Sequence, residues 1–238
     1  MANLIIVMDV QQKEEHVRRL LMLDGLTHVT EERDSAYCPI SLTSVPPELK
    51  PAIASRQKWL MDLLKGMGIR AYDPLSSTKY SPDLNLNATH RDVYFFDAAR
   101  VAAGEYFTGH KILPSDGQGV ESEIAKSLGK KSVILLDREI RVSRMMPSRT
   151  IYLSYDRCEN HSDEVRALFQ MLQEYDTGFG LKDNLPVLVG FPRNGGSPVD
   201  LEEAVYRNFP GLQFHYDGTL PIVRLRAENP ELFYELRK

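Results

Sequence analysis

Short apolar runs alternate with amphipathic segments along most of this chain, and that alternation is the feature that most limits its fold. The clearest example is the segment 51–67, where Ile53, Leu60 and Leu64 recur at helical spacing, and a short expected strand at 69–72 follows. Strands separated by helices form parallel sheets whose two faces are both covered. The sequence therefore predicts an α/β fold with a mostly parallel sheet and helices on both faces.

The same pattern covers most of the sequence. Strands are expected at residues 4–8, 36–40, 69–72, 111–113, 132–136, 151–155 and 186–191. Helices are expected at residues 14–23, 51–67, 92–103, 120–128, 162–174 and 198–208. In such sheets ligands bind beyond the carboxyl ends of the strands, where loops run into helix N-termini. The long loop expected at residues 76–89 is a candidate substrate loop.

The composition is that of an ordinary globular protein. Hydrophobic residues make up 42% of the 238 residues and charged residues 26%, which argues against global disorder and against a coiled-coil rod. The net charge of −4 gives no electrostatic reason to expect nucleic acid or an anionic membrane as a partner. We therefore look for a small-molecule ligand.

Neither a membrane segment nor a metal site is expected. The apolar run 4–8 is shorter than a signal peptide's core and far shorter than the about 20 residues of a spanning helix. Cys38 and Cys158 are too few for a disulfide scaffold and lack zinc-site spacing. No two of the six histidines stand three or four residues apart. We expect a soluble, cytoplasmic protein without a bound metal.

Residues 114–125 combine the end of an expected strand, a glycine-rich turn and the start of a helix. Gly117 and Gly119 allow the backbone to approach a ligand closely, and the helix N-terminus presents N–H groups to it. Ser122 stands where a dinucleotide fingerprint would have its third glycine, and no Gly-Lys-Ser/Thr follows as in a Walker loop. The turn is therefore a ligand-binding candidate of another kind.

Glu121 is the chemically informative residue of this segment. We expect it in the first turn of the helix, where the helix N-terminus favours an ionised carboxylate. An ionised carboxylate at the mouth of a site suits a nucleophile better than a proton donor. The alternative is that Glu121 is only a favourable charge in a first turn.

Asp97, residues 115–121, Ala125 and the pair Gly129-Lys130 resemble the nucleoside 2-deoxyribosyltransferase superfamily. The resemblance is to its 2'-deoxynucleoside 5'-phosphate N-hydrolase branch, which has the pattern Pro-Ser-x-Gly-x-Gly-x-Glu-x-x-x-Ala after a strand. It covers about residues 36–140, and its specific part is 114–131. It implies a flavodoxin-like, or Rossmann-like, sheet, cleavage of an N-glycosidic bond without a cofactor, and a homo-oligomer.

The resemblance implies roles for three groups of the site. Breaking the bond between C1' and the base passes through an oxocarbenium-like state, which a carboxylate stabilises or traps covalently. We expect Glu121 to be that nucleophile. Asp97 and Asp116 are both candidates for the second acid or base. Tyr37 is the candidate for the tyrosine that orients the glutamate in this family.

Further residues are expected to hold a nucleoside or nucleotide substrate. Ser41 stands near the place of a glycine that usually follows the family's first strand. Ser115 is expected either to hydrogen-bond a phosphate or to be only a turn or cap residue. Gly117 and Gly119 complete the expected substrate-binding set.

The reaction has open alternatives at this point. Hydrolysis is favoured over transfer of the sugar to another base, because the Pro-Ser loop looks more like that of the hydrolase branch. A nucleotide-binding or sensing module of the same fold, without turnover, is the second hypothesis. A phosphoribohydrolase of the lysine-decarboxylase-like group ranks lower, because residues 114–119 do not provide its Pro-Gly-Gly-x-Gly-Thr motif.

The chain is expected to consist of an N-terminal extension at residues 1–35, a core at 36–150 and a C-terminal α/β part at 151–238. That last part either extends the same sheet or forms a small second domain. Within it, Arg193 and a helix N-terminus are candidates for an anion site. The alternative is a plain capped helix start, with Ser197 as the cap and Asp200 three residues on.

Overall fold

A five-stranded parallel sheet is the centre of the computed structural model, which describes residues 6–7, 10–23, 25–26, 28–40, 45–74, 89–112, 115–137, 150–155, 157–182 and 185–209. The strand order is β3-β2-β4-β5-β6, and every neighbouring pair is parallel. The bounds are β2 Glu32–Tyr37, β3 Arg70–Tyr72, β4 Gly104–Lys111, β5 Lys131–Asp137 and β6 Thr150–Tyr155. This is the flavodoxin-like order, so the expected fold class is confirmed.

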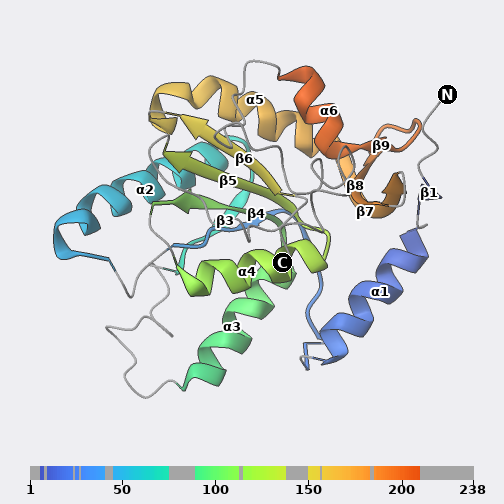
Figure 1. Cartoon of the computed structure of the whole chain (residues 1–238), viewed down its shortest axis with the longest axis horizontal. Helices are drawn as coiled ribbons and strands as arrows, with labels where there is room; N and C mark the ends of the chain where they lie inside the picture. Colours follow the sequence, from blue (N-terminus) through green and yellow to red (C-terminus); the bar gives the residue numbers. More distant parts are fainter. Residues whose placement is uncertain are drawn as a thin grey trace, which may run out of the picture.

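Helices cover both faces of this sheet (Figure 1). The helices α2 (Lys50–Gly66) and α5 (Ser162–Gln173) pack on one face. The helices α3 (His90–Ala103) and α4 (Asp116–Ser127) lie on the other. Burial of each large apolar side chain between these layers stabilises the fold by about 1.5–3 kcal/mol.

Strand alternation decides which side chains meet which helices. Tyr37 and Phe107 belong to the cluster that packs against α3 and α4. Cys38 and Tyr106, each one position away along its chain, belong to the cluster that packs against α2 and α5. Because successive side chains of a strand point to opposite faces, Tyr37 at the end of β2 is directed toward α4.

A second, antiparallel sheet contains β1 (Ile6–Val7), β7 (Tyr175–Lys182), β8 (Leu185–Pro192) and β9 (Val199–Asp200). The helix α1 (Val10–Leu23) follows β1, and α6 (Leu201–Asn208) follows β9. The described part of the strand expected at residues 4–8 is β1, which therefore pairs with β7 and not within the parallel sheet. β7 itself was not predicted. The proposed domain division stays a prediction, with β6 in the sheet of the core.

Several expected boundaries are wrong. β2 runs over Glu32–Tyr37 and not over 36–40, and α1 begins at Val10 and not at residue 14. β4 begins at Gly104 and not at Lys111, since its buried polar residues hide the strand pattern. α4 begins at Asp116, because Ser115 caps it by accepting a hydrogen bond from the Gln118 N–H at 3.3 Å. α6 begins at Leu201 with Asp200 as its cap, so Ser197 is not the cap.

The amino-terminal ends of the parallel strands hold a buried charge cluster. Lys131 and Glu105 form an ion pair, with side chains 0% and 4% exposed. Arg193 approaches Glu105 at 2.5 Å and Asp176 at 3.0 Å. Asp34 joins the cluster, its N–H donating to Glu105 at 2.6 Å. The Arg193 guanidinium is thus paired with carboxylates of the protein, so the structure does not support Arg193 as part of an anion site.

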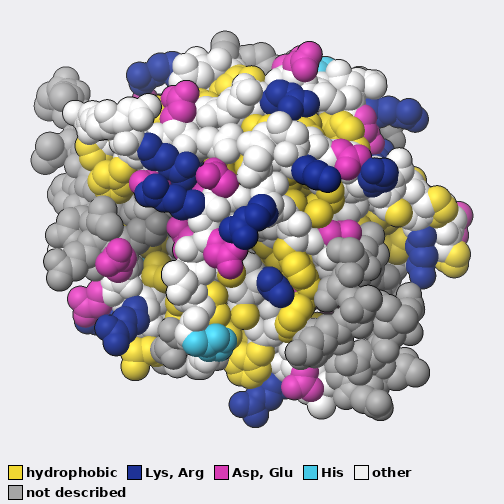
Figure 2. Space-filling model, turned by 180° about the vertical axis from the view of Figure 1, so that it is seen from behind, with side chains coloured by type: hydrophobic (Ala, Val, Ile, Leu, Met, Phe, Trp, Pro, Cys, Tyr) yellow, Lys and Arg dark blue, Asp and Glu magenta, His cyan; other side chains and the backbone are white. Residues whose placement is uncertain are grey.

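On the face that Figure 2 shows, basic and acidic side chains of the described residues are interspersed. Such mixing gives a polyanion no single-sign field to follow. Within the described residues, no helix is long and apolar enough to cross a membrane.

Gly109 in β4 is expected to tolerate no side chain. A Cβ at this position would lie 2.6 Å from the Pro39 carbonyl oxygen, which is a backbone atom and cannot turn away. Gly109→Ala should therefore lower the free energy of unfolding by about 1–3 kcal/mol. Gly119→Ala is the matched control, since a Cβ there meets nothing within 4 Å and the residue is helical. Urea unfolding of both variants measures the effect, and equal stabilities would contradict it.

Candidate active site

The candidate site lies at the carboxyl edge of the sheet between β2 and β4. From β2 the chain crosses to β3 on one side, whereas β4 leads to β5 on the other. This reversal is the switch point where open α/β sheets bind their ligands. Tyr37 ends β2 at this edge, and the short β4–α4 connection brings the start of α4 beside it.

A hydrogen bond joins two of the predicted residues here. The Tyr37 hydroxyl donates to the Glu121 Oε1 at 2.7 Å. The Tyr37 ring is 1% exposed and stacks between Tyr72, at 5.8 Å between ring centroids, and Phe107, at 6.1 Å. Because these neighbours fix the ring, the position of the Tyr37 hydroxyl is also fixed. Its hydrogen bond therefore positions the Glu121 carboxyl group.

Asp97 completes a group of three. It lies on α3, whose start is fixed by a capping box between Thr89 and Asp92. Its carboxyl interacts with the Tyr37 hydroxyl, and its charge acts on Glu121. The structure thus brings together Tyr37, Asp97 and Glu121, which come from β2, α3 and α4.

Burial changes the protonation of both carboxyl groups. It raises the pKa of Glu121 from 4.5 to about 8, with the negative charge of Asp97 adding to the rise and the Tyr37 hydrogen bond opposing it. Burial also raises the pKa of Asp97. The expectation that the helix N-terminus keeps Glu121 ionised is wrong, because α4 begins at Asp116 and Glu121 lies in its second turn, beyond the reach of the terminal dipole.

Asp116 does not share this environment. It is exposed in the first turn of α4, five residues before Glu121. At about 100° per residue the two side chains point about 140° apart around the helix. Among the described contacts, none joins Asp116 to Tyr37 or Asp97, so the second acid of this group is Asp97.

The expected substrate-binding residues are placed unevenly. Gly117 and Gly119 are exposed within the first turn of α4, with room above both for a ligand. Ser115 caps the helix, as its alternative interpretation expected, and its hydroxyl proton is still available to a ligand. Ser41 and most of the expected substrate loop at 76–89 lie outside the described residues.

Three polar residues of this edge, Gln118, Gln57 and His110, were given no role by sequence reasoning. Gln118 is buried, and its amide Nε2 donates to the His110 carbonyl at 3.2 Å, which ties α4 to the end of β4. Gln57 on α2 donates to the Cys38 carbonyl at 3.1 Å and to the Asp73 carboxylate at 3.2 Å. An isolated Gln or His carries no motif in the sequence. The only signal near these residues was the position of Gln118 within the glycine-rich turn.

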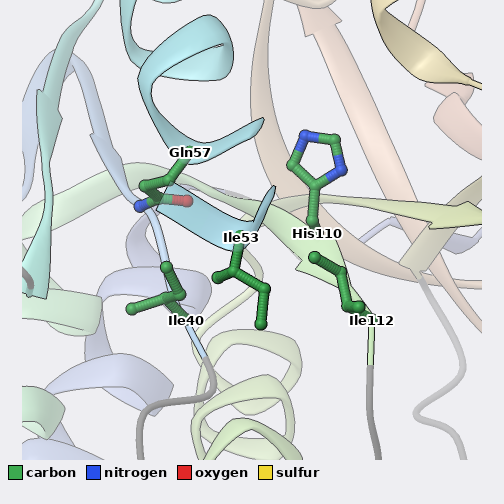
Figure 3. A pocket seen from close by; sticks show the side chains of 5 residues that line it. All are labelled: Ile40, Ile53, Gln57, His110 and Ile112. Atoms are coloured by element: carbon green, nitrogen blue, oxygen red, sulfur yellow. The ribbon is translucent and has the colours of Figure 1, made fainter. Parts of the chain in front are cut away.

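His110 and Gln57 line a small pocket together with three isoleucines (Figure 3). Its enclosed space has room for about one water-sized group, far less than the pockets that enclose a drug-sized ligand. Burial lowers the pKa of His110 to about 3, with the nearby Arg56 charge adding to the fall. The imidazole is therefore neutral at physiological pH.

The raised pKa of Glu121 predicts a pH-dependent stability. The folded chain holds this proton more tightly than the unfolded chain, so the carboxyl destabilises the fold as pH rises from about 4.5 to about 8. Glu121→Gln removes the titration, and relative to that variant the wild type should lose about 2 kcal/mol across this interval, less than the whole shift because the carboxyl stays partly exposed. Urea unfolding at several pH values measures it, with Glu123→Gln on the exposed face as the control. A constant difference between wild type and Glu121→Gln would contradict the assignment.

The described residues contain no cluster of three or more His, Cys, Asp or Glu side chains able to hold a metal ion. The chemistry available to the site from these residues is that of two carboxyl groups and a phenol.

No protein-family model matches the chain, and no curated protein does. Among solved structures, the chain is similar to the Clostridium botulinum CMP N-glycosidase BcmB, at 16% sequence identity and a TM-score of 0.43. The likeness covers 56% of this chain and 98% of that one.

Proposed function

We propose that the protein cleaves the N-glycosidic bond of a (deoxy)nucleoside or a (deoxy)nucleoside 5'-monophosphate. The observation that carries the proposal is the hydrogen bond of 2.7 Å from Tyr37 to Glu121, at the switch point of a flavodoxin-like sheet. Asp97 shares this site and supplies the second carboxyl group. Two carboxyl groups beside a glycosidic bond are what its cleavage with a covalent intermediate needs.

The positions of the protons in the site suit one carboxyl group acting as the nucleophile and the other as the acid. The Tyr37 hydroxyl has one proton, and it is donated to Glu121. Burial raises the pKa of both carboxyl groups, that of Glu121 to about 8, so the pair retains a proton near neutral pH. We propose that in the reactive form this proton is on Asp97, the acid, and that Glu121 is the anion stabilised by the phenol.

The reaction then balances in two steps. A Glu121 carboxylate oxygen bonds to C1' while the bond from C1' to the base breaks, and the base takes the electron pair and the Asp97 proton. Water next attacks C1', gives its proton to Asp97 and releases Glu121 from the sugar. We propose water and not a second base as the acceptor, on the resemblance of the Pro-Ser loop to the hydrolase branch.

Chromatographic detection of the released base tests the proposal. Ribonucleosides and 2'-deoxyribonucleosides, each with and without a 5'-phosphate, are incubated with the protein, alone or with an added acceptor base. We expect free base without an acceptor. A new nucleoside that forms only with the acceptor would replace hydrolysis by transfer. Binding of a nucleotide without any release would favour the sensing module. The observation that supports this second candidate is the raised pKa of Glu121, because a protonated carboxyl group is a poor nucleophile.

A further inference from the structure

The pocket beside the candidate site is uncharged and mostly apolar. Its lining is Ile40, Ile53, Gln57, His110 and Ile112, and in Figure 3 the three isoleucines lie together below the two polar side chains. Both Nε2 protons of Gln57 are used by protein acceptors, so this amide offers a ligand only its oxygen. The neutral His110 ring adds a polar group without a charge.

The pocket and the carboxyl pair lie on opposite sides of the strand ends. Ile53 and Gln57 belong to α2, which covers the face opposite to α4. Glu121 belongs to α4, and Tyr37 reaches it from the α4 side. Two short links keep the sites adjacent. Gln57 donates to the carbonyl of Cys38, the residue that follows Tyr37. Gln118, one helical turn before Glu121, donates to the His110 carbonyl. A ligand that occupies both sites must pass over the ends of β2 and β4.

This arrangement selects the part of a nucleoside that enters the pocket. The base is bonded directly to C1', the atom that Glu121 attacks, and must stay close to the carboxyl pair. The 5' carbon is three bonds from C1' through the ring oxygen, so the 5' end is the part of the sugar best able to reach across the strand ends.

The charges around the pocket disfavour a phosphate there. A phosphate taken out of water without a counter-charge loses several kcal/mol of solvation. Lys111 ends β4, and strand alternation directs it to the α4 side, away from His110 and the pocket. Arg56, whose charge lies near His110, is paired with the Glu159 carboxylate at 3.5 Å and already has a counter-charge. At the start of α4, the exposed Asp116 carboxylate already occupies the end of the helix that would attract an anion.

We propose that this pocket receives the 5' end of the substrate and selects an uncharged group there, a 5'-hydroxyl or a small apolar 5' substituent, over a 5'-phosphate. The assignment rests on the proposed function, because it takes Glu121 as the residue at C1'. It narrows the substrate class from nucleosides and nucleotides to nucleosides.

Matched substrates that differ only at the 5' position test this preference. A 5'-deoxynucleoside, its parent nucleoside and the 5'-monophosphate of the same base are compared by kcat/KM for base release. We expect the two uncharged substrates to exceed the monophosphate by about tenfold or more. An equal or higher value for the monophosphate would overturn the assignment.

A pocket variant adds a second, independent readout. Ile53→Arg places a cation in the pocket and should shift the preference toward the monophosphate by about tenfold, whereas the uncharged Ile53→Met should keep the wild-type order. If the arginine variant does not fold, the wild-type comparison still decides. A variant that folds and keeps the wild-type order would count against the assignment.

Ligand-induced melting shifts separate this assignment from the proposed function. Stabilisation of wild type by the 5'-deoxynucleoside but not by the monophosphate, without any base release, would retain the pocket assignment and reject the catalytic proposal. Base release with the opposite 5' preference would do the reverse. Neither binding nor release would reject both.

Discussion

Replacing Glu121 with Gln is expected to reduce base release by about 10³-fold or more while the protein stays folded. Glutamine has the shape of a protonated glutamate and can still accept the Tyr37 hydrogen bond of 2.7 Å. It cannot form an ester with C1', and it cannot stabilise a positive sugar with a negative charge. The loss should therefore appear in kcat as well as in kcat/KM, because the missing interaction belongs to the transition state.

Glu123→Gln is the matched control for that experiment. Glu123 lies two residues further along α4, is exposed, and forms an ion pair with Lys126 at 2.8 Å. Its replacement should change activity less than about twofold, since an exposed pair contributes little. Chromatographic initial rates for wild type and both variants are sufficient. Undiminished release by Glu121→Gln would contradict its role as nucleophile, and equal losses in both variants would show a general effect on α4.

Glu105→Ala is expected to produce the largest loss of stability, about 3–5 kcal/mol. Its carboxylate is the partner of Lys131, whose side chain is 0% exposed, and of Arg193 at 2.5 Å. Without Glu105, the Lys131 ammonium is left buried beside Tyr106, 4.8 Å from the ring centroid, with no carboxylate in contact among its described partners. Burial already lowers the pKa of Lys131, and Glu105 opposes this effect.

The comparison for Glu105→Ala is Asp62→Ala, which breaks the exposed ion pair of Asp62 with Lys58. That change should cost less than about 1 kcal/mol. Urea unfolding, followed by circular dichroism, measures both. Comparable losses for the two variants would contradict the importance assigned to the buried pair.

The sheet was predictable where local pattern and burial agree. Residues 133–136 are apolar throughout and lie in β5, because a central parallel strand is buried on both faces. β4 was mostly missed, since Glu105, Thr108 and His110 are polar and yet buried. Lys131 pairs with Glu105 and lies 26 residues further along the chain, so no local window could have revealed why that carboxylate is inside.

The grouping of Tyr37, Asp97 and Glu121 was predictable, whereas their protonation and the position of Asp116 outside the group were not. The resemblance proposed Tyr37, Asp97 and Glu121, and the structure brings these three together. The charge state of Glu121 depends on where α4 begins. The sequence analysis placed the start of this helix at Val120, because Ser115 was not assigned as its cap. The start at Asp116 moves Glu121 to the second turn and into burial. The pocket depends on α2 lying over the ends of β2 and β4, which only the tertiary fold specifies.

The short edge strand β3 has a consequence for how the protein behaves at high concentration. It is three residues long, Arg70–Tyr72, and pairs with β2 along its inner side. Unpaired backbone groups at a sheet edge are templates for the strands of other molecules, and shortness and charge limit that recruitment. Arg70 supplies the charge, exposed and 2.9 Å from Glu32. This margin of the sheet is therefore protected against edge-to-edge aggregation.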